Sequence, residues 1–263
     1  MLRKLLKYDL KDIYKVLIIF YILSLFFAAT TRIMFEFSNS VVMNVISSIL
    51  SGVTISMIFN IIVNNIMRMW ANFRRNFYGD ESYLTHTLPL KKSELYLSKT
   101  LSAAISLLLS TAVIILTLLL AYGNKENFEF LKQTFTPLES SLGNDFYFIL
   151  AAVCLIIFLE LLNAMQCGFS GIILGHKMGG GKIGFSVLFG FIYYSASQIF
   201  VLLITFIAGL FDSDFMKLFT SNELSSLSLI KSIIYLALTA YFMAVIITYF
   251  INLKLFKKGV NVD

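Results

Sequence analysis

Charged residues are scarce in this 263-residue sequence. Asp, Glu, Lys and Arg together make up 14% of it, whereas a soluble domain carries about 25%. Proline occurs only at Pro89 and Pro137, so nearly the whole chain is free to be helical. Hydrophobic residues account for 58% of the chain, and its mean hydropathy is +0.83. One water-soluble core could not bury so much apolar surface. The composition therefore predicts an all-α polytopic membrane protein.

Cysteine and histidine are also rare. Cys154 and Cys167 fall in one expected helix, roughly 20 Å apart, which is too far for a disulfide. They are expected to be small buried apolar residues. His86 and His176 lie in different polar loops and are expected to be solvated. Because no Cys, His or carboxylate cluster has the spacing of metal ligands, the sequence predicts neither a metal site nor a catalytic centre.

A phosphate-binding loop is absent from the sequence as well. Such a loop needs Gly, four residues, then Gly-Lys and Ser or Thr. Here Gly181-Lys182 has His176 in the place of the first glycine and is followed by Ile183. The chain thus has no nucleotide-binding motif of its own, and no cofactor is expected in it.

Long apolar segments are what the sequence does contain. A membrane core of about 30 Å needs about 20 apolar helical residues, and six segments are long enough. These predicted spans are 14–36, 41–69, 97–122, 146–175, 183–211 and 229–254. The outer loop 123–145 exceeds 20 residues and is expected to have some structure of its own.

Residues 1–15 show a different pattern. Their apolar residues follow helical spacing, with Lys, Arg and Asp between them; these apolar residues are Leu2, Leu5, Leu6, Leu10 and Ile13. This pattern is typical of an amphipathic helix that lies at the membrane surface. A solvated basic tail is the alternative.

The basic residues also predict an orientation. Sixteen of the 21 Lys and Arg residues fall on one side if the N-terminus is inside. Because cytoplasmic segments carry the excess of Lys and Arg, both termini are expected in the cytoplasm of a multi-pass plasma-membrane protein. The segment 78–92, between the second and third spans, is expected on the same side.

Few polar residues interrupt the spans. Glu160 is the only carboxylate deep inside one, and Asn163 and Gln166 follow it at helical spacing. Such a stripe indicates either a substrate-pathway or gating site or hydrogen bonds between helices. Asn64, with Asn60 and Asn65, forms a second patch in the second span. This patch is either a partner of Glu160 or a mark of the helix's extension into the cytoplasm.

Small residues occur at four-residue spacing in two spans. Gly171 and Gly175 form one such pair, and Ser48, Gly52 and Ser56 form another set. This spacing favours close packing of helices, within the bundle or across a dimer.

The longest polar interruption of the first half is residues 74–99. Asp80 is a good N-cap residue for a short helix from Glu81 to about Leu88. Leu84 and Leu88 lie one turn apart on this helix and form an apolar face. Pro89 ends this helix. The prediction is a helix, a break and a second helix that continues into the third span. A membrane-surface helix that contacts only lipid is the alternative.

Residues Gly79–Ser93, followed by Leu97-Ser98-Lys99, resemble the loop between spans two and three of ABC-2 type transporter permeases. That loop has an acidic residue, then Leu-x-x-x-Leu-Pro, a basic and Ser-containing segment, and a Lys that opens the third span. In that family it forms a coupling helix that docks on a separate ATPase subunit. The resemblance implies that the ATPase-interface residues are Asp80, Glu81, Tyr83, Leu84, Leu88 and Pro89.

The resemblance also implies a function. The chain would be the permease subunit of an ABC exporter, with no enzyme activity of its own. Two permease chains, expected as a homodimer, would join two ATPase chains that bring ATP and Mg²⁺. The cargo would be amphipathic or hydrophobic, with peptides such as antimicrobial peptides favoured. Membrane lipid is a further partner, and nucleic acid is not expected to be one.

Two other functions stay open. The chain could be an ATPase-independent secondary transporter or channel that uses Glu160 as an ion or proton relay. It could also be an assembly or sensor subunit that transports nothing. The substrate-pathway or gating residues of the transport interpretations are Glu160, Asn163, Gln166 and Asn64.

Overall fold

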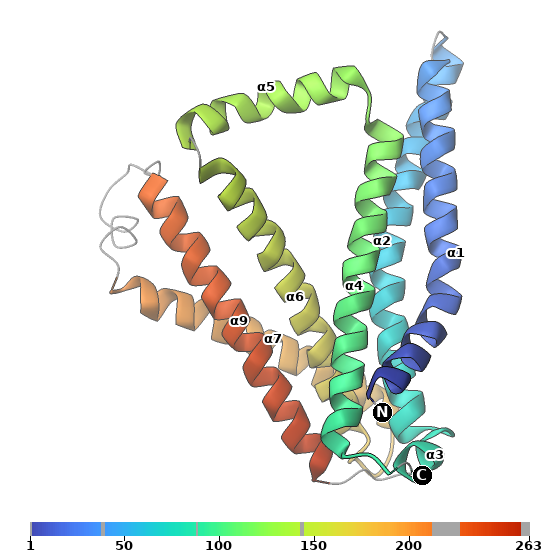
Figure 1. Cartoon of the computed structure of the whole chain (residues 1–263), viewed down its shortest axis with the longest axis vertical. Coiled ribbons are helices and arrows are strands. Elements are labelled where there is room, and N and C mark those ends of the chain that lie inside the picture. The colour runs from blue at the N-terminus through green and yellow to red at the C-terminus, as the bar shows by residue number, and fades with distance from the viewer. Residues whose placement is uncertain (1, 38–39, 88, 143–144, 212–226, 259–263) are drawn as a thin grey trace. The chain divides into compact units, whose positions relative to one another are not determined.

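The computed structural model describes residues 2–37, 40–87, 89–142, 145–211 and 227–258 (Figure 1). The helices of this part of the chain are α1 (Leu2–Glu36), α2 (Val41–Tyr78), α3 (Ser82–Thr87), α4 (Lys92–Tyr122), α5 (Lys125–Leu142), α6 (Asp145–Gly175), α7 (Lys182–Gly209) and α9 (Leu227–Lys257). No strand occurs among the described residues, which confirms the all-α prediction for them.

In the part of the chain that the structure describes, six helices are long and apolar enough to cross a membrane. The spans are Leu2–Glu36, Val41–Tyr78, Lys92–Tyr122, Tyr147–Gly175, Lys182–Gly209 and Lys231–Lys257. Each of them overlaps one predicted span, which confirms six long apolar helices in the predicted order among the described residues. They indicate a multi-pass membrane protein. The loop predicted at 123–145 contains α5, which confirms that it has structure of its own.

The chain divides into two compact units. The N-terminal unit consists of residues 1–73 and 89–132, and the C-terminal unit consists of residues 74–88 and 133–263. Each unit is described by itself below.

In the N-terminal unit, α1 packs against α4. The buried residues of α1 are three or four positions apart and form one stripe, Asp9, Ile13, Leu17, Tyr21, Ser24, Ala28 and Thr31. Hydroxyl groups join the helices: the Tyr21 Oη lies 2.7 Å from the Ser110 Oγ, and the Thr31 Oγ1 lies 2.9 Å from the Thr54 Oγ1. Such hydrogen bonds are typical of helices in a membrane. The hydrophobic effect does not drive helices together in lipid, so their association depends on packing and on hydrogen bonds between them.

The structure does not confirm a separate helix over residues 1–15. Figure 1 shows α1 as one continuous ribbon, and the helix runs from Leu2 to Glu36 without a break. The amphipathic pattern is present in part, since Arg3 and Lys4 are exposed while Leu5 is half-buried. Asp9, however, lies on the stripe that packs against α4. Nothing in the sequence at residues 12–18 breaks a helix, so this segment continues directly into the first span.

In the C-terminal unit, α6 packs closely against α7 and also contacts α9. A Cβ atom added to Gly171 would lie 2.5 Å from the Gly190 backbone nitrogen, and one added to Gly175 would lie 2.5 Å from the Ser186 nitrogen. Only glycine allows this approach, so Gly171 and Gly175 pack within the bundle, which is one of the two alternatives that their spacing left open. By contrast, a Cβ on Gly52 of α2 would meet nothing within 4 Å.

The two cysteines differ in environment. Cys167 is buried as predicted, but Cys154 is exposed, so the prediction is wrong for Cys154. In an apolar span, an exposed small thiol is as acceptable to lipid as a buried one is to the protein core.

Candidate functional site

The predicted coupling segment forms a short helix, α3, whose two faces differ. Ser82 is buried, whereas Tyr83 and Leu84 are 77% and 71% exposed. The helix spans Ser82–Thr87, against the predicted 81–88. Leu88 lies outside the described residues. Two adjacent large apolar side chains therefore project from one side of α3.

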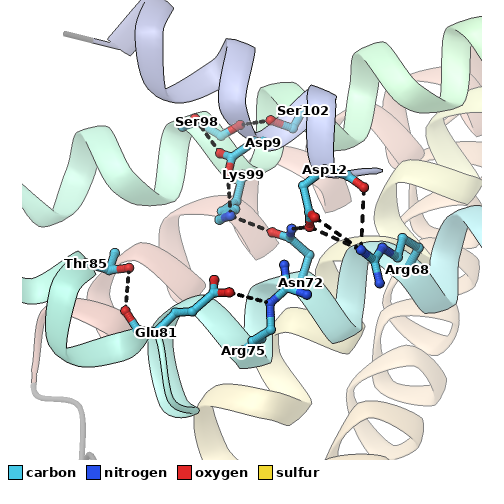
Figure 2. Close-up of polar contacts among 10 residues, drawn as sticks. All are labelled: Asp9, Asp12, Arg68, Asn72, Arg75, Glu81, Thr85, Ser98, Lys99 and Ser102. Carbon is cyan, nitrogen blue, oxygen red and sulfur yellow. Dashed lines mark hydrogen bonds and ion pairs between the residues drawn. The ribbon is translucent and has the colours of Figure 1, made fainter. Parts of the chain in front are cut away.

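An ion pair and a hydrogen bond help to hold the start of α3. The Glu81 carboxylate lies 3.1 Å from the Arg75 Nε, on the last turn of α2, and both side chains are roughly half exposed (Figure 2). The Thr85 hydroxyl donates to the Glu81 carbonyl oxygen over 3.0 Å. The helix begins at Ser82, so Glu81, and not the predicted Asp80, is the residue before it. Asp80 and Pro89 are both exposed.

Aromatic rings hold the inner side of α3. The His86 ring lies 6.2 Å from the Phe77 ring and 6.5 Å from the Phe256 ring, which are themselves 4.7 Å apart. The His86 Nε2 is also 3.4 Å from the Phe77 carbonyl oxygen. Phe77 lies in the last turn of α2 and Phe256 in the last turn of α9, and both are fully buried. α3 is thus fixed to the ends of two long helices, and the prediction that His86 is simply solvated is wrong.

His176 is also buried, contrary to prediction. It follows α6, its ring lies 4.5 Å from the Tyr78 ring, and its Nδ1 lies 2.9 Å from the Ile172 carbonyl oxygen. Burial lowers the pKa of His176 below its ordinary value of 6.5. The nearby charges of Arg74 and Lys182 lower this pKa further, and the hydrogen bond to Ile172 opposes them. The neutral imidazole is therefore the form that the fold favours.

Two residues of the polar stripe of α6, Asn163 and Gln166, are buried and hydrogen-bonded to neighbouring helices. Asn163 is buried, and its Nδ2 donates to the Ser197 Oγ of α7 over 2.6 Å. Gln166 is buried one turn later, and its backbone carbonyl oxygen accepts from the Asn252 Nδ2 of α9 over 2.9 Å, whereas its buried side-chain Oε1 has no hydrogen-bond partner among the described residues. The Asn163 side chain therefore joins α6 to α7, which is one of the two interpretations of the stripe, whereas the contact of Gln166 with α9 is made by its backbone.

Glu160 has a different environment from its two stripe neighbours. It is half-buried and accepts a hydrogen bond of 3.2 Å from the Tyr194 Oη of α7. A carboxylate has about four acceptor positions, so one hydrogen bond leaves most of its capacity unused.

The second predicted patch lies on α2, in the N-terminal unit. The Asn64 Nδ2 donates to the Asn60 carbonyl oxygen of its own helix over 2.8 Å. The Asn65 Nδ2 donates to the Ser110 Oγ over 2.6 Å, and its Oδ1 accepts from Ser106 over 3.0 Å. These hydrogen bonds connect α2 to itself and to α4.

The N-terminal unit contains a buried ion pair that the sequence did not predict. The Lys99 Nζ lies 2.6 Å from the Asp9 Oδ1 and 2.6 Å from the Asn72 Oδ1, and the Ser98 Oγ donates to the Asp9 Oδ2 over 2.9 Å (Figure 2). All four residues are buried. The ion pair joins α1 to α4, and the hydrogen bond from Lys99 to Asn72 adds α2.

A second acidic residue of α1 extends this network. The Asn72 Nδ2 donates to the Asp12 Oδ2 over 2.6 Å, and the Arg68 guanidinium lies 3.3 Å from both carboxylate oxygens of Asp12 (Figure 2). We define the polar cluster as Asp9, Asp12, Arg68, Asn72, Ser98 and Lys99. Its members compensate one another's charge, so it is equipped to hold α1, α2 and α4 in one arrangement.

The described residues contain no group of three or more His, Cys, Asp and Glu side chains that could hold a metal ion. Comparison with protein-family models, with curated proteins and with solved structures found no match for this chain.

Proposed function

We propose that this chain is the permease subunit of an ABC exporter and that α3 is the surface on which a separate ATPase subunit docks. The observation that carries the proposal is the exposure of Tyr83 and Leu84 on a helix whose other side is fixed. Exposed aromatic and apolar side chains on a rigid support are typical anchors of protein interfaces. The resemblance of residues 79–93 to the coupling loop of ABC-2 type permeases supports the same assignment.

α3 is held firmly enough by its contacts to transmit a force to the helices behind it. A helix of six residues is unstable by itself, so without these contacts a force on it would unfold or displace the helix alone. The half-exposed Arg75–Glu81 pair contributes at most about 1 kcal/mol. The buried rings of Phe77 and Phe256 hold α3 more firmly, because they contact His86 from its inner side. A displacement of α3 would therefore pass to the ends of α2 and α9.

The proposed assembly has two copies of this chain and two ATPase subunits, with both termini of each permease chain in the cytoplasm. ATP and Mg²⁺ bind to the ATPase subunits. Their closure on ATP would press on α3 and switch the bundle between inward and outward access. The cargo would be amphipathic or hydrophobic, with peptides preferred.

Copurification tests this function. The tagged chain, extracted from its native membranes in mild detergent, is expected to bring down an ATPase with a phosphate-loop motif in near-equal amount. Leu84→Asp places a charge on the exposed face of α3 and should reduce the recovered ATPase by at least about tenfold. Met178→Asp, on the exposed turn after α6, is the matched control and should recover the ATPase normally.

The proposal fails if no ATPase copurifies, or if Leu84→Asp and Met178→Asp recover it equally. It also fails if transport continues in cells that lack every candidate ATPase.

Glu160 supports a second candidate function. A half-buried carboxylate in the middle of a span, with one hydrogen bond to Tyr194, has the chemistry of an ion or proton relay. Transport driven by an ion gradient without ATP, and abolished by Glu160→Gln, would favour a secondary transporter or channel over the exporter.

A further inference from the structure

Glu160 lies at the centre of an apolar helix, fifteen residues from either end of α6. A charged group at this depth costs at least a few kcal/mol unless it is compensated. Asn163, one turn further along, is fully buried and hydrogen-bonded to α7, but Glu160 remains half-exposed. The Glu160 carboxylate is therefore partly exposed at the protein surface and can accept further hydrogen bonds.

Two phenol rings from neighbouring helices accompany this carboxylate. Tyr194 of α7 donates its hydrogen bond to Glu160, and Tyr241 of α9 bonds to Gln198, which is one turn along α7 from Tyr194. The Tyr241 Oη donates to the Gln198 Oε1 over 3.2 Å, which fixes that ring relative to α7. Both tyrosines are half-buried. One carboxylate and two held aromatic rings thus come together from three helices.

This combination selects one kind of ligand. Aromatic faces carry negative potential and attract a cation, and a carboxylate pairs with the same charge. An anion would be repelled, and a neutral apolar group would leave Glu160 uncompensated. A divalent metal ion needs several oxygen ligands, and this site supplies a single carboxylate.

We propose that Glu160, Tyr194 and Tyr241 form a recognition site for an organic ammonium group carried by a hydrophobic molecule. The carboxylate pairs with the positive charge, and the two rings contact the alkyl substituents around the nitrogen. The chemistry is shared by a lysine side chain of an amphipathic peptide and by a small alkylammonium compound. That such a molecule is the cargo rests on the proposed function, whereas its binding to this site does not.

Binding to the whole chain in lipid nanodiscs tests the site, with empty nanodiscs as the reference for partition into lipid. The probes are benzyltrimethylammonium, an amphipathic peptide with one lysine, and the same peptide with that lysine acetylated. At least one cationic probe should bind, and the acetylated peptide should bind about tenfold more weakly than the lysine peptide if the peptide is the ligand. The cationic probe that binds more tightly identifies the source of the ammonium group.

Substitutions locate the binding. Glu160→Gln keeps the shape of the side chain and should weaken the cationic probes by about tenfold or more. Tyr241→Leu removes a ring and should weaken them roughly three- to thirtyfold, whereas Tyr241→Phe keeps the ring and most of the affinity. Tyr235→Leu, on the same helix, removes an exposed ring that lies 5.5 Å from the Phe148 ring, and should leave the affinity unchanged.

Equal affinity of the cationic probes for the original chain and for Glu160→Gln would overturn the site, as would binding to neither. If Glu160→Gln does not fold, the comparison of Tyr241→Leu with Tyr241→Phe decides, and equal affinities there reject the site. These measurements use the chain without an ATPase, so their failure leaves the exporter proposal to its own test.

Discussion

Lys99 of α4 and Asp9 of α1 form an ion pair with 2.6 Å between the Nζ and the Oδ1, and the two side chains are only 3% and 5% exposed. The residues are 90 positions apart in the chain. Two buried charges are costly to remove from water, and their attraction offsets this cost only with good geometry and further hydrogen bonds. Ser98 and Asn72 supply those hydrogen bonds.

Removing one partner of this pair should destabilise the N-terminal unit strongly. Lys99→Met would leave the Asp9 charge buried without its cation, at a cost of about 3–5 kcal/mol. The double variant Asp9→Leu/Lys99→Met should recover most of this loss, because two apolar side chains bury no charge. Unfolding in mixed detergent micelles, titrated with sodium dodecyl sulfate, measures both variants.

The exposed pair Arg32–Glu36, one turn apart on α1, provides the control. Arg32→Met should change the free energy of unfolding by no more than about 0.5 kcal/mol. A loss for Lys99→Met that is as small as this would show that the buried pair does not stabilise the unit.

Close packing of α6 on α7 predicts a second effect on stability. In Gly171→Ala the new methyl group meets the Gly190 backbone, so α7 must shift, at a cost of about 1–3 kcal/mol. Gly52→Ala, where the methyl meets nothing within 4 Å, should be neutral or slightly stabilising, because alanine is the better helix former. The same detergent titration compares them. Equal effects of the two substitutions would argue against the packing of Gly171 on α7.

The lowered pKa of His176 predicts a dependence of stability on pH. The folded chain holds this imidazole neutral, so the unfolded chain binds more protons just below its ordinary pKa of 6.5. The stabilisation is complete above about pH 6.5 and is lost as the pH falls from there through the folded-state pKa. Thermal unfolding in detergent at pH 7.5 and pH 5.5 should therefore show a lower midpoint at pH 5.5.

His176→Phe is the matched variant for this measurement. It keeps a ring beside Tyr78 but removes the titrating group, so the drop between pH 7.5 and pH 5.5 should become smaller. An unchanged drop would assign the pH dependence to other groups.

The Arg75–Glu81 pair predicts that Glu81 serves α3 by anchoring it. Glu81→Arg places two cations side by side and should reduce the amount of ATPase that copurifies with the chain. The exchange Arg75→Glu/Glu81→Arg restores an opposite pair and should restore most of that ATPase. If the exchange restores none, Glu81 contacts the partner directly.

Local features of the sequence predicted much of this structure. Apolar runs and the near absence of proline predicted the six long helices of the described residues, and the short helix predicted from Glu81 to about Leu88 is present, beginning one residue later at Ser82. The spacing of Gly171 and Gly175 also predicted a packing face correctly.

Residues that meet across the fold were not predicted. Asp9 lies four positions before Ile13 and eight before Leu17, so it belongs to the otherwise apolar stripe of α1. A charged residue at such a position is the feature of the sequence that could have indicated a buried ion-pair partner. The identity of the partner, Lys99, depends on how α1 packs against α4, which no local pattern specifies. In the same way, the inner face of α3 depends on Phe256, which comes from the far end of the chain.

Crosslinking at the exposed face of α3 tests the docking claim most directly. A photoreactive amino acid replaces Leu84 in one variant and Met178, on the exposed turn after α6, in the control. Both chains are irradiated in living cells, and the crosslinked proteins are identified by mass spectrometry. We expect an adduct with a phosphate-loop ATPase from position 84 and none from position 178. Adducts from position 84 that contain only lipid, or the same ATPase adduct from both positions, would contradict the docking of an ATPase on α3.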